Sequence, residues 1–324
     1  MPPILRAPEN LCLYENPLET AAFLNSLYSE AVVLRLDFTP TQNMTAAAAL
    51  ALFAHINNIQ RSKGNNGCFD IYCKLSPVYT KFFIKTGLLT ALKQGRNFNN
   101  NSRLFRFGCA DNYLVQRREI LKKFDEYEAE FIKQNPSSAN ELKDFFSQSR
   151  TAFNEVLINI KNHAYSYPEP SGNEHSPIGY NQYTAKAWWQ MFWVTFDEQT
   201  KKPGLLNVLV YDLGVGITSS FVGHTEGGRR NNLNHQNDPA HIMDEAMKEG
   251  MSRFIGQGRG NGLPRILDMV KRFEGSGLFV YSGRGCSRIK KDGRFGTTTL
   301  PQSLPGTLIE WTLPIPHCKD DLHE

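Results

Sequence analysis

A candidate acid–base and metal-binding pair lies in the segment from Phe153 to Tyr165. Apolar residues recur in this segment at helical spacing and neither Gly nor Pro interrupts it, so the pattern predicts an amphipathic helix. Glu155 and Asn159 are four residues apart, which places their side chains one turn apart on one face, and Asn162 and His163 continue that face. A carboxylate and a carboxamide in this arrangement can hold a metal ion and orient a water molecule. For this segment taken alone, an ordinary solvated helix face is the alternative interpretation.

Two glycine-rich segments follow this helix in the chain. A β-rich segment, 206–211, ends at Asp212, and Gly214 and Gly216 come directly after it. Farther on, the run Gly-Gln-Gly-Arg-Gly-Asn-Gly-Leu at 256–263 precedes apolar residues at helical spacing. Glycines allow the backbone to approach a ligand closely, and the amide groups at a helix start can bind anionic oxygens. Each glycine cluster alone is a common turn, but the two clusters after a Glu-x-x-x-Asn helix form a specific combination.

This combination resembles the GHKL family of ATPases, which includes gyrase, a heat-shock chaperone, histidine kinases and mismatch-repair proteins. The resemblance covers roughly Phe145 to Pro316. The segment from Gly306 to Trp311 is similar to the late strand of that family, which carries a Thr near the adenine. The resemblance implies a Bergerat-type ATP-binding fold, with ATP and Mg²⁺ as cofactors.

The resemblance also assigns roles to the matching residues. Glu155 would be the catalytic base that activates a water or a hydroxyl, Asn159 would be the Mg²⁺ ligand, and Asp212 would accept a hydrogen bond from the adenine amino group. Gly214 and Gly216 would line the base pocket. Further nucleotide contacts are expected from Asn162, His163, Ser252, Arg253, Gly256, Gly258, Arg259, Gly260, Asn261, Gly262, Leu263 and Thr307.

Residues around this candidate site carry further expectations. The interval from Thr218 to Gly250 corresponds to the lid that closes over ATP in GHKL proteins. Ser252 and Arg253 follow it, and they either reach a phosphate or form a structural turn. Asn162 occupies a position where many histidine kinases carry Lys or Arg, so the corresponding phosphate contact is left open here.

Composition sets limits on the class of protein. The chain has 324 residues, 40% hydrophobic and 21% charged, which suffices for two globular domains. The formal charge of +4 is modest and no Lys/Arg-rich block occurs, so nucleic acid is not indicated. The six cysteines form no Cys-x-x-Cys pair and are expected to be reduced thiols. The N-terminus does not have the pattern of a signal peptide, and the longest apolar run, Thr45–Ala54, is too short to span a bilayer. We therefore expect a soluble cytoplasmic protein with no membrane span.

The N-terminal part predicts a small α/β layer. Strands are expected at 31–38 and 69–73, with helices starting at Thr45 and at Val78. This order resembles a STAS domain, the fold of anti-sigma factor antagonists. In that family a Ser or Thr at the helix start can be phosphorylated, and Thr45 falls nearest that place. The alternative is that Thr45 is an ordinary helix cap.

These expectations combine into one domain organisation of the α/β class. A small STAS-like α/β domain at 1–112 would precede a helical connector at 113–150. A two-layer α/β sandwich, the Bergerat fold, would occupy 151–316, and 317–324 would form a tail. The N-terminal domain would bind a protein partner, and the connector could support a homodimer.

Three functions fit these features. The first is Mg²⁺-dependent ATP binding and hydrolysis coupled to a regulatory N-terminal domain. The second is a serine/threonine protein kinase of the anti-sigma-factor type, in which Glu155 would deprotonate a protein hydroxyl. The third is a nucleotide-gated interaction module with little catalysis. Histidine autokinase activity is disfavoured, because no evident dimerisation helix with a phosphoacceptor His precedes Glu155, and His55 lies inside the small N-terminal domain.

Overall fold

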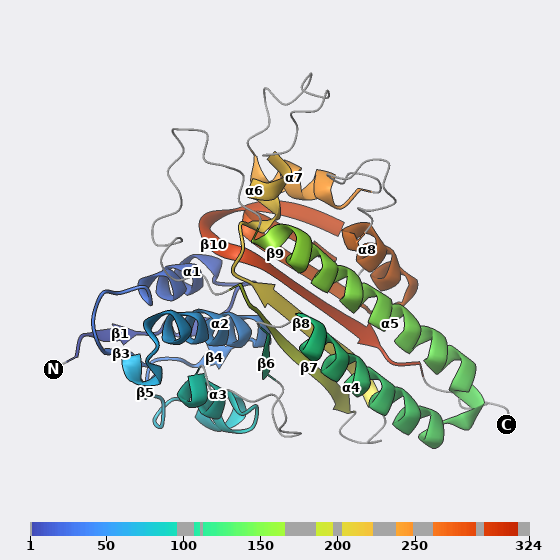
Figure 1. The fold of residues 1–324 in the computed structure, drawn as a ribbon, viewed down its shortest axis with the longest axis horizontal. Helices are drawn as coiled ribbons and strands as arrows, with labels where there is room; N and C mark the ends of the chain where they lie inside the picture. Colours follow the sequence, from blue (N-terminus) through green and yellow to red (C-terminus); the bar gives the residue numbers. More distant parts are fainter. Residues whose placement is uncertain are drawn as a thin grey trace.

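The computed structural model describes residues 2–95, 107–110, 113–165, 186–196, 203–222, 238–248, 262–289 and 295–316. In this part of the chain the fold is mixed α/β, which confirms the expected class, and it is built on a five-stranded antiparallel sheet (Figure 1). The order across the sheet is β6 (Phe107–Ala110), β7 (Trp188–Phe196), β8 (Pro203–Asp212), β10 (Phe295–Pro314) and β9 (Gly277–Ile289).

Both faces of this sheet are buried. On β8, Val208 and Val210 belong to one hydrophobic core and Leu209 and Tyr211 belong to another. Side chains of a strand alternate between the two faces of a sheet, so the two cores lie on opposite sides. This explains why the strand is apolar nearly throughout and does not alternate between apolar and polar residues.

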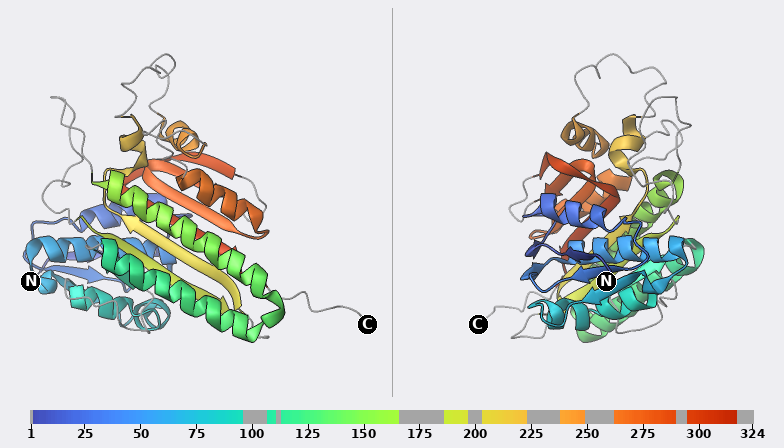
Figure 2. Two further views of the ribbon diagram at one scale, coloured as in Figure 1. Left: turned by 45° about the vertical axis from the view of Figure 1, so that its right-hand side comes forward. Right: turned by 90° about the vertical axis from the view of Figure 1, so that its left-hand side faces the viewer.

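Helices cover the first face (Figures 1 and 2). These are α4 (Tyr113–Gln134), α5 (Ala139–Asn159) and α8 (Gly262–Arg272). The short 3-10 helix Pro136–Ser138 separates α4 from α5, as Pro136 predicts, and Arg150 of α5 is ion-paired with Asp125 and Glu128 of α4. The helix expected at Phe153 is therefore the last third of α5, which continues into the π-helical turn η5 (Ile160–Ala164).

The N-terminal unit, residues 2–95, contains a three-stranded parallel sheet of order β1-β3-β5 and a two-stranded sheet of β2 and β4. The Thr45 side chain accepts a hydrogen bond from the Ala48 amide at 3.3 Å and caps α2, which confirms the helix start. The expected strand at 31–38 is shorter, and the helix expected from Val78 is π-helical. The elements are β1 (Ile4–Arg6), β2 (Asn10–Leu11), α1 (Pro17–Ser26), β3 (Leu34–Asp37), β4 (Asn43–Met44), α2 (Ala46–Lys63), η1 (Asn66–Cys68), β5 (Phe69–Tyr72), η2 (Tyr79–Ile84) and α3 (Leu88–Gln94).

The N-terminal unit packs on the second face of the large sheet. One continuous core joins α1 and α2 to β7, β8, β9 and β10. Polar contacts cross the same boundary: Trp189 Nε1 donates to Asn57 Oδ1 at 3.0 Å, and the Tyr14 hydroxyl donates to Glu310. β6 lies before the domain boundary expected at 112 yet belongs to the large sheet, and α5 runs across the boundary expected at 150.

Two short helices contact strands β9 and β10. They are α6 (Gly216–Val222) and α7 (Pro239–Ala246). The Asp238 side chain caps α7 by accepting from the Ala240 amide at 3.2 Å, and Pro239 is the first residue of the helix. The remainder of the expected lid and the tail at 317–324 lie outside the described residues.

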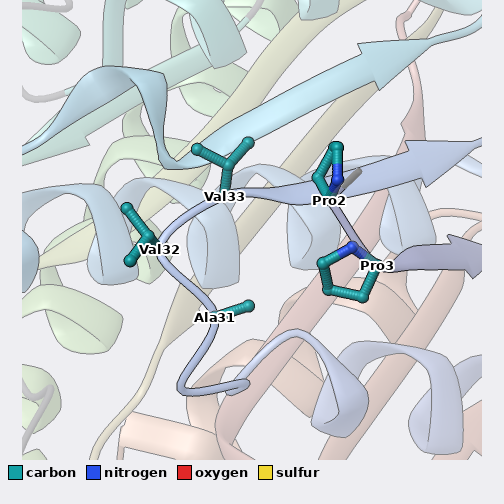
Figure 3. Close-up of a pocket in the computed structure, with 5 residues that line it drawn as sticks. All are labelled: Pro2, Pro3, Ala31, Val32 and Val33. Carbon is teal, nitrogen blue, oxygen red and sulfur yellow. The ribbon is translucent and has the colours of Figure 1, made fainter.

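Several further features of the described residues bear on function. Cys12, Cys68, Cys73 and Cys286 are buried free thiols, as expected. None of the described helices combines the length and the hydropathy that a membrane span requires. An open depression at the start of β1 is lined by Pro2, Pro3, Ala31, Val32 and Val33, whose apolar side chains offer no group to hold an anion or a metal (Figure 3).

The shared core predicts that the two parts unfold together. Leu52 of α2 is fully buried in that core, and Leu52→Ala should lower the stability of the whole protein by about 2–5 kcal/mol. Leu18→Ala, at a half-exposed position of α1, is the matched control and should cost less than about 0.5 kcal/mol. Thermal unfolding followed by tryptophan fluorescence tests this. A tryptophan transition that keeps its wild-type midpoint in Leu52→Ala would show that the sheet unfolds independently.

Candidate functional site

The predicted site residues within the described part of the chain fall into two groups at one end of the large sheet. We name each group after its expected role. The base end contains Asp212, Gly214, Gly216 and Thr307. The phosphate end contains Glu155, Asn159, Gly262 and Leu263, and Asn162 and His163 follow Asn159 in the chain. The other predicted residues, Ser252, Arg253, Gly256, Gly258, Arg259, Gly260 and Asn261, lie outside the described residues.

The base end is a buried polar cluster on three strands. Asp212 is the last residue of β8 and is 5% exposed, and Thr307 lies directly opposite it on β10. The Gly214 amide donates to Asp212 Oδ1 at 2.8 Å. From β9, Ser282 Oγ lies 3.1 Å from Thr307 Oγ1 and donates to the Gly306 carbonyl at 3.1 Å.

Burial raises the pKa of Asp212 from its ordinary value of 3.8 to about 7, while hydrogen bonds from the Gly214 and Thr307 amides oppose that rise. No salt bridge among the described residues reaches this carboxyl group. A buried carboxyl group held by amides and not by a cation is suited to accept a hydrogen bond from a neutral donor. An amino group on a flat, uncharged ring is a donor of this kind.

Close backbone approaches explain the glycines of the base end. A Cβ atom on Gly214 would lie 2.1 Å from the carbonyl oxygen of Ala164, which also accepts from the Val215 amide at 2.7 Å. Gly306 has φ of +79°, and a Cβ there would lie 1.8 Å from the Asp212 carbonyl oxygen. Gly216 also has φ of +79°. These glycines are therefore required by the packing of η5, the turn after β8 and strand β10 against one another.

The phosphate end lies where the last turns of α5 run beside the start of α8. Asn159 of α5 faces the first residue of α8, because a Cβ on Gly262 would lie 2.7 Å from Asn159 Nδ2. One turn earlier on α5, Glu155 forms an ion pair with Arg265 of α8. The Glu155 side chain is 20% exposed and that of Arg265 is 55% exposed, so the pair lies at the surface. Leu263, the second residue of α8, packs against the core beneath the helices.

The turn η5 connects the two ends. Asn162 and His163 lie on it and are half-buried. The hydroxyl group of Tyr165, which follows η5, donates to the Ala187 carbonyl and accepts from the Leu213 amide at 3.2 Å. The segment that carries Glu155 and Asn159 is thus tied directly to the turn that follows Asp212.

Sequence reasoning did not identify Arg265 or Ser282 as site residues. Arg265 is three residues after Gly262, which places it one turn into α8 from the glycine run, and this spacing was a usable signal. Ser282 had no local signal, because its role depends on the pairing of β9 with β10.

The residues present are compatible with ATP and Mg²⁺. The described residues contain no cluster of three or more His, Cys, Asp or Glu that could hold a metal by themselves. Mg²⁺ commonly takes one or two protein oxygens and completes its coordination with substrate phosphates and water. Asn159, beside the start of α8, supplies one such oxygen near the place where a helix N-terminus favours anions.

Comparison with models of known protein families and with curated proteins found no match for this chain. Its function is therefore inferred from the side chains and the geometry described above.

The buried Asp212 predicts a pH dependence of stability. Because its folded pKa of about 7 exceeds the ordinary value of 3.8, the folded state binds more protons between these values, and its stability falls as pH rises through 7. At about 1.4 kcal/mol per pKa unit, wild type should lose on the order of 3 kcal/mol more than Asp212→Asn between pH 5 and pH 8. Chemical denaturation at both pH values measures this difference.

Glu310 provides an internal control for that experiment. Burial also raises its pKa to about 7, so its contribution falls over the same pH range in both proteins and cancels in the comparison. Equal losses of stability in wild type and Asp212→Asn would contradict the elevated pKa of Asp212.

Proposed function

We propose that this protein is a Mg²⁺-dependent ATPase of the GHKL type, with a Bergerat-like nucleotide site at the end of the large sheet and a STAS-like N-terminal unit packed behind it. The observation that carries the proposal is a convergence of distant segments. Asp212 and Thr307 form one end of the site, and Glu155 and Asn159 form the other against the start of α8.

The base end supports adenine over guanine. In adenine the exocyclic group is an amino donor, which the Asp212 carboxyl group can accept. In guanine the equivalent position is a carbonyl oxygen, which would face the carboxyl oxygen as a second acceptor. A site whose buried acceptor is left unpaired discriminates strongly against such a ligand.

The phosphate end supports anion binding and metal coordination. The amides at the N-terminus of α8 are orphan donors that favour phosphate oxygens. Gly262, without a side chain, leaves the Asn159 carboxamide in contact with this helix start. Mg²⁺, when bound with the phosphates, would neutralise their charge and hold their oxygens for transfer.

Glu155 is the candidate base for water activation. Its Oε1 is bound by Arg265, which leaves Oε2 as an acceptor for the proton of a water molecule. Arg265 thereby fixes the orientation of the carboxylate from the neighbouring helix. In this interpretation Arg265 is a positioning residue, and Glu155 is the group that moves the proton.

A protein kinase is the second candidate, because the Glu155 carboxylate is partly exposed and a hydroxyl group of another protein could approach it. The N-terminal unit of the same molecule does not fit as its substrate. Thr45 starts α2 on one side of the large sheet, whereas Glu155 lies on α5 on the opposite side. A kinase reaction would therefore use another molecule as the acceptor.

Two variants distinguish the proposed catalytic role of Glu155 from the proposed adenine-binding role of Asp212. Glu155→Ala should bind ATP as wild type does and lose about 10²- to 10⁴-fold in turnover, because only the proton acceptor is removed. Asp212→Asn should weaken ATP binding, because an amide can present its NH₂ group to the adenine amino group. Equilibrium titration and phosphate release measure the two effects. Wild-type turnover by Glu155→Ala would refute this base, and ATP consumption without phosphate release would favour the kinase.

The ion pair predicts a role for Arg265 in turnover. Arg265→Gln should lower kcat about tenfold or more with little change in ATP affinity, because a misoriented base slows the reaction without affecting nucleotide binding. Arg265→Lys, which keeps the charge, should restore part of the loss. Arg272→Gln is the matched control on the last turn of α8, where the side chain donates to Gln148 Oε1 at 3.5 Å. An unchanged kcat in Arg265→Gln would show that the pair has no part in catalysis.

A further inference from the structure

The part of β10 that leads into Thr307 is irregular. Pairing of β10 with β8 begins only at Thr307 and Asp212, and the register with β9 shifts between Thr299 and Leu304 and again between Leu304 and Thr307. Between Thr299 and Thr307 the pairing with β9 contains Leu304 alone, opposite Gly283, so the ladder determines little of the course of residues 302–306. A segment of this kind needs other hydrogen bonds to hold its backbone in one position.

Side chains supply these bonds. Each of four carbonyl groups in this segment accepts a hydrogen bond from a side chain of another element. Tyr281 Oη donates to the Gln302 carbonyl at 3.0 Å, and Asn25 Nδ2 donates to the Ser303 carbonyl at 3.2 Å. Tyr211 Oη donates to the Pro305 carbonyl at 2.6 Å, and Ser282 Oγ donates to the Gly306 carbonyl at 3.1 Å. The segment before Thr307 is thus held from outside the ladder.

The donor to Pro305 is itself held by the N-terminal unit. His55 Nε2 of α2 lies 3.0 Å from Tyr211 Oη. Tyr211 has a single hydroxyl proton and donates it to the Pro305 carbonyl, so its oxygen accepts from His55, and Nε2 is the nitrogen that carries the proton. His55 is fully buried, and the Tyr28 ring packs edge-on against it at 5.5 Å.

The other ring nitrogen of His55 has no hydrogen-bond partner within the described part of the chain. Burial lowers the pKa of His55 to about 3, so the ring is neutral at physiological pH. Burying a ring nitrogen without a hydrogen bond costs free energy, and an apolar side chain at this position would avoid that cost. The hydrogen bond to Tyr211 is therefore the interaction that a histidine, and not an apolar residue, provides at this position.

We propose that His55 is a positioning residue for the base end of the site, acting through Tyr211 to hold the segment that carries Gly306 and Thr307 opposite Asp212. This inference rests on the proposed function, since the affected ligand is the adenine base. It makes α2 part of the support of the nucleotide site.

The test compares His55→Leu, which removes the donor, with His55→Gln, whose amide can replace it. His55→Leu should raise the Kd for ATP about tenfold and reduce the preference for ATP over GTP, whereas His55→Gln should stay within about twofold of wild type. Tyr211→Phe removes the bond to Pro305 itself and should weaken ATP binding at least as much as His55→Leu. Combining the two should add little, because His55 acts through the Tyr211 hydroxyl. Ile56→Val, a buried change next to His55, is the control for general loss of stability.

Hydrogen exchange in the absence of nucleotide gives a readout that does not depend on ATP. Amides at 304–307 should exchange faster in His55→Leu and Tyr211→Phe than in Ile56→Val at equal distance from the melting temperature. If wild type does not bind ATP, the proposed function fails while this exchange pattern still tests the connection. Wild-type exchange in both variants, or wild-type ATP affinity in a folded His55→Leu, would overturn the role of His55.

Discussion

The structure depends on a direct contact between backbones at one end of the large sheet. Gly306 of β10 and Gly214 after β8 lie so close to neighbouring carbonyl groups that any side chain would collide with them. These contacts bring the end of η5, the turn after Asp212 and strand β10 into one place. Because η5 continues α5, they also determine where Glu155 and Asn159 lie relative to Asp212. The candidate site follows from this packing and from the contacts of α5 with α8, which runs beside it.

A second constraint comes from the burial of both faces of the sheet. The helices cover one face, and the N-terminal unit covers the other with polar contacts that include the bond from His55 to Tyr211. Tyr211 directly precedes Asp212, so the two sides of the sheet meet at the base end. An arrangement of this kind allows a change at the N-terminal unit to reach the candidate site through a few contacts, without movement of the whole sheet.

The sequence was sufficient for features that depend on local pattern. The helix at Glu155, the strand that ends at Asp212 and the cap at Thr45 are all carried by spacing and residue type within a few positions. The pairing of Glu155 with Arg265 could not be predicted, because it depends on how α5 and α8 lie against each other in the folded chain. Likewise, His55 and Tyr211 are 156 residues apart in the chain, and nothing local marks either as a partner of the other.

The most direct test of the central claim is a crystal structure with a non-hydrolysable ATP analogue and Mg²⁺. The account predicts the adenine ring between the Asp212 turn and Thr307, with its amino group on the Asp212 carboxyl group. It also predicts the phosphates at the N-terminus of α8, with Asn159 on the metal ion. An analogue bound elsewhere, or one whose base lies away from Asp212, would contradict the account and leave the buried carboxyl group as a structural feature of the sheet.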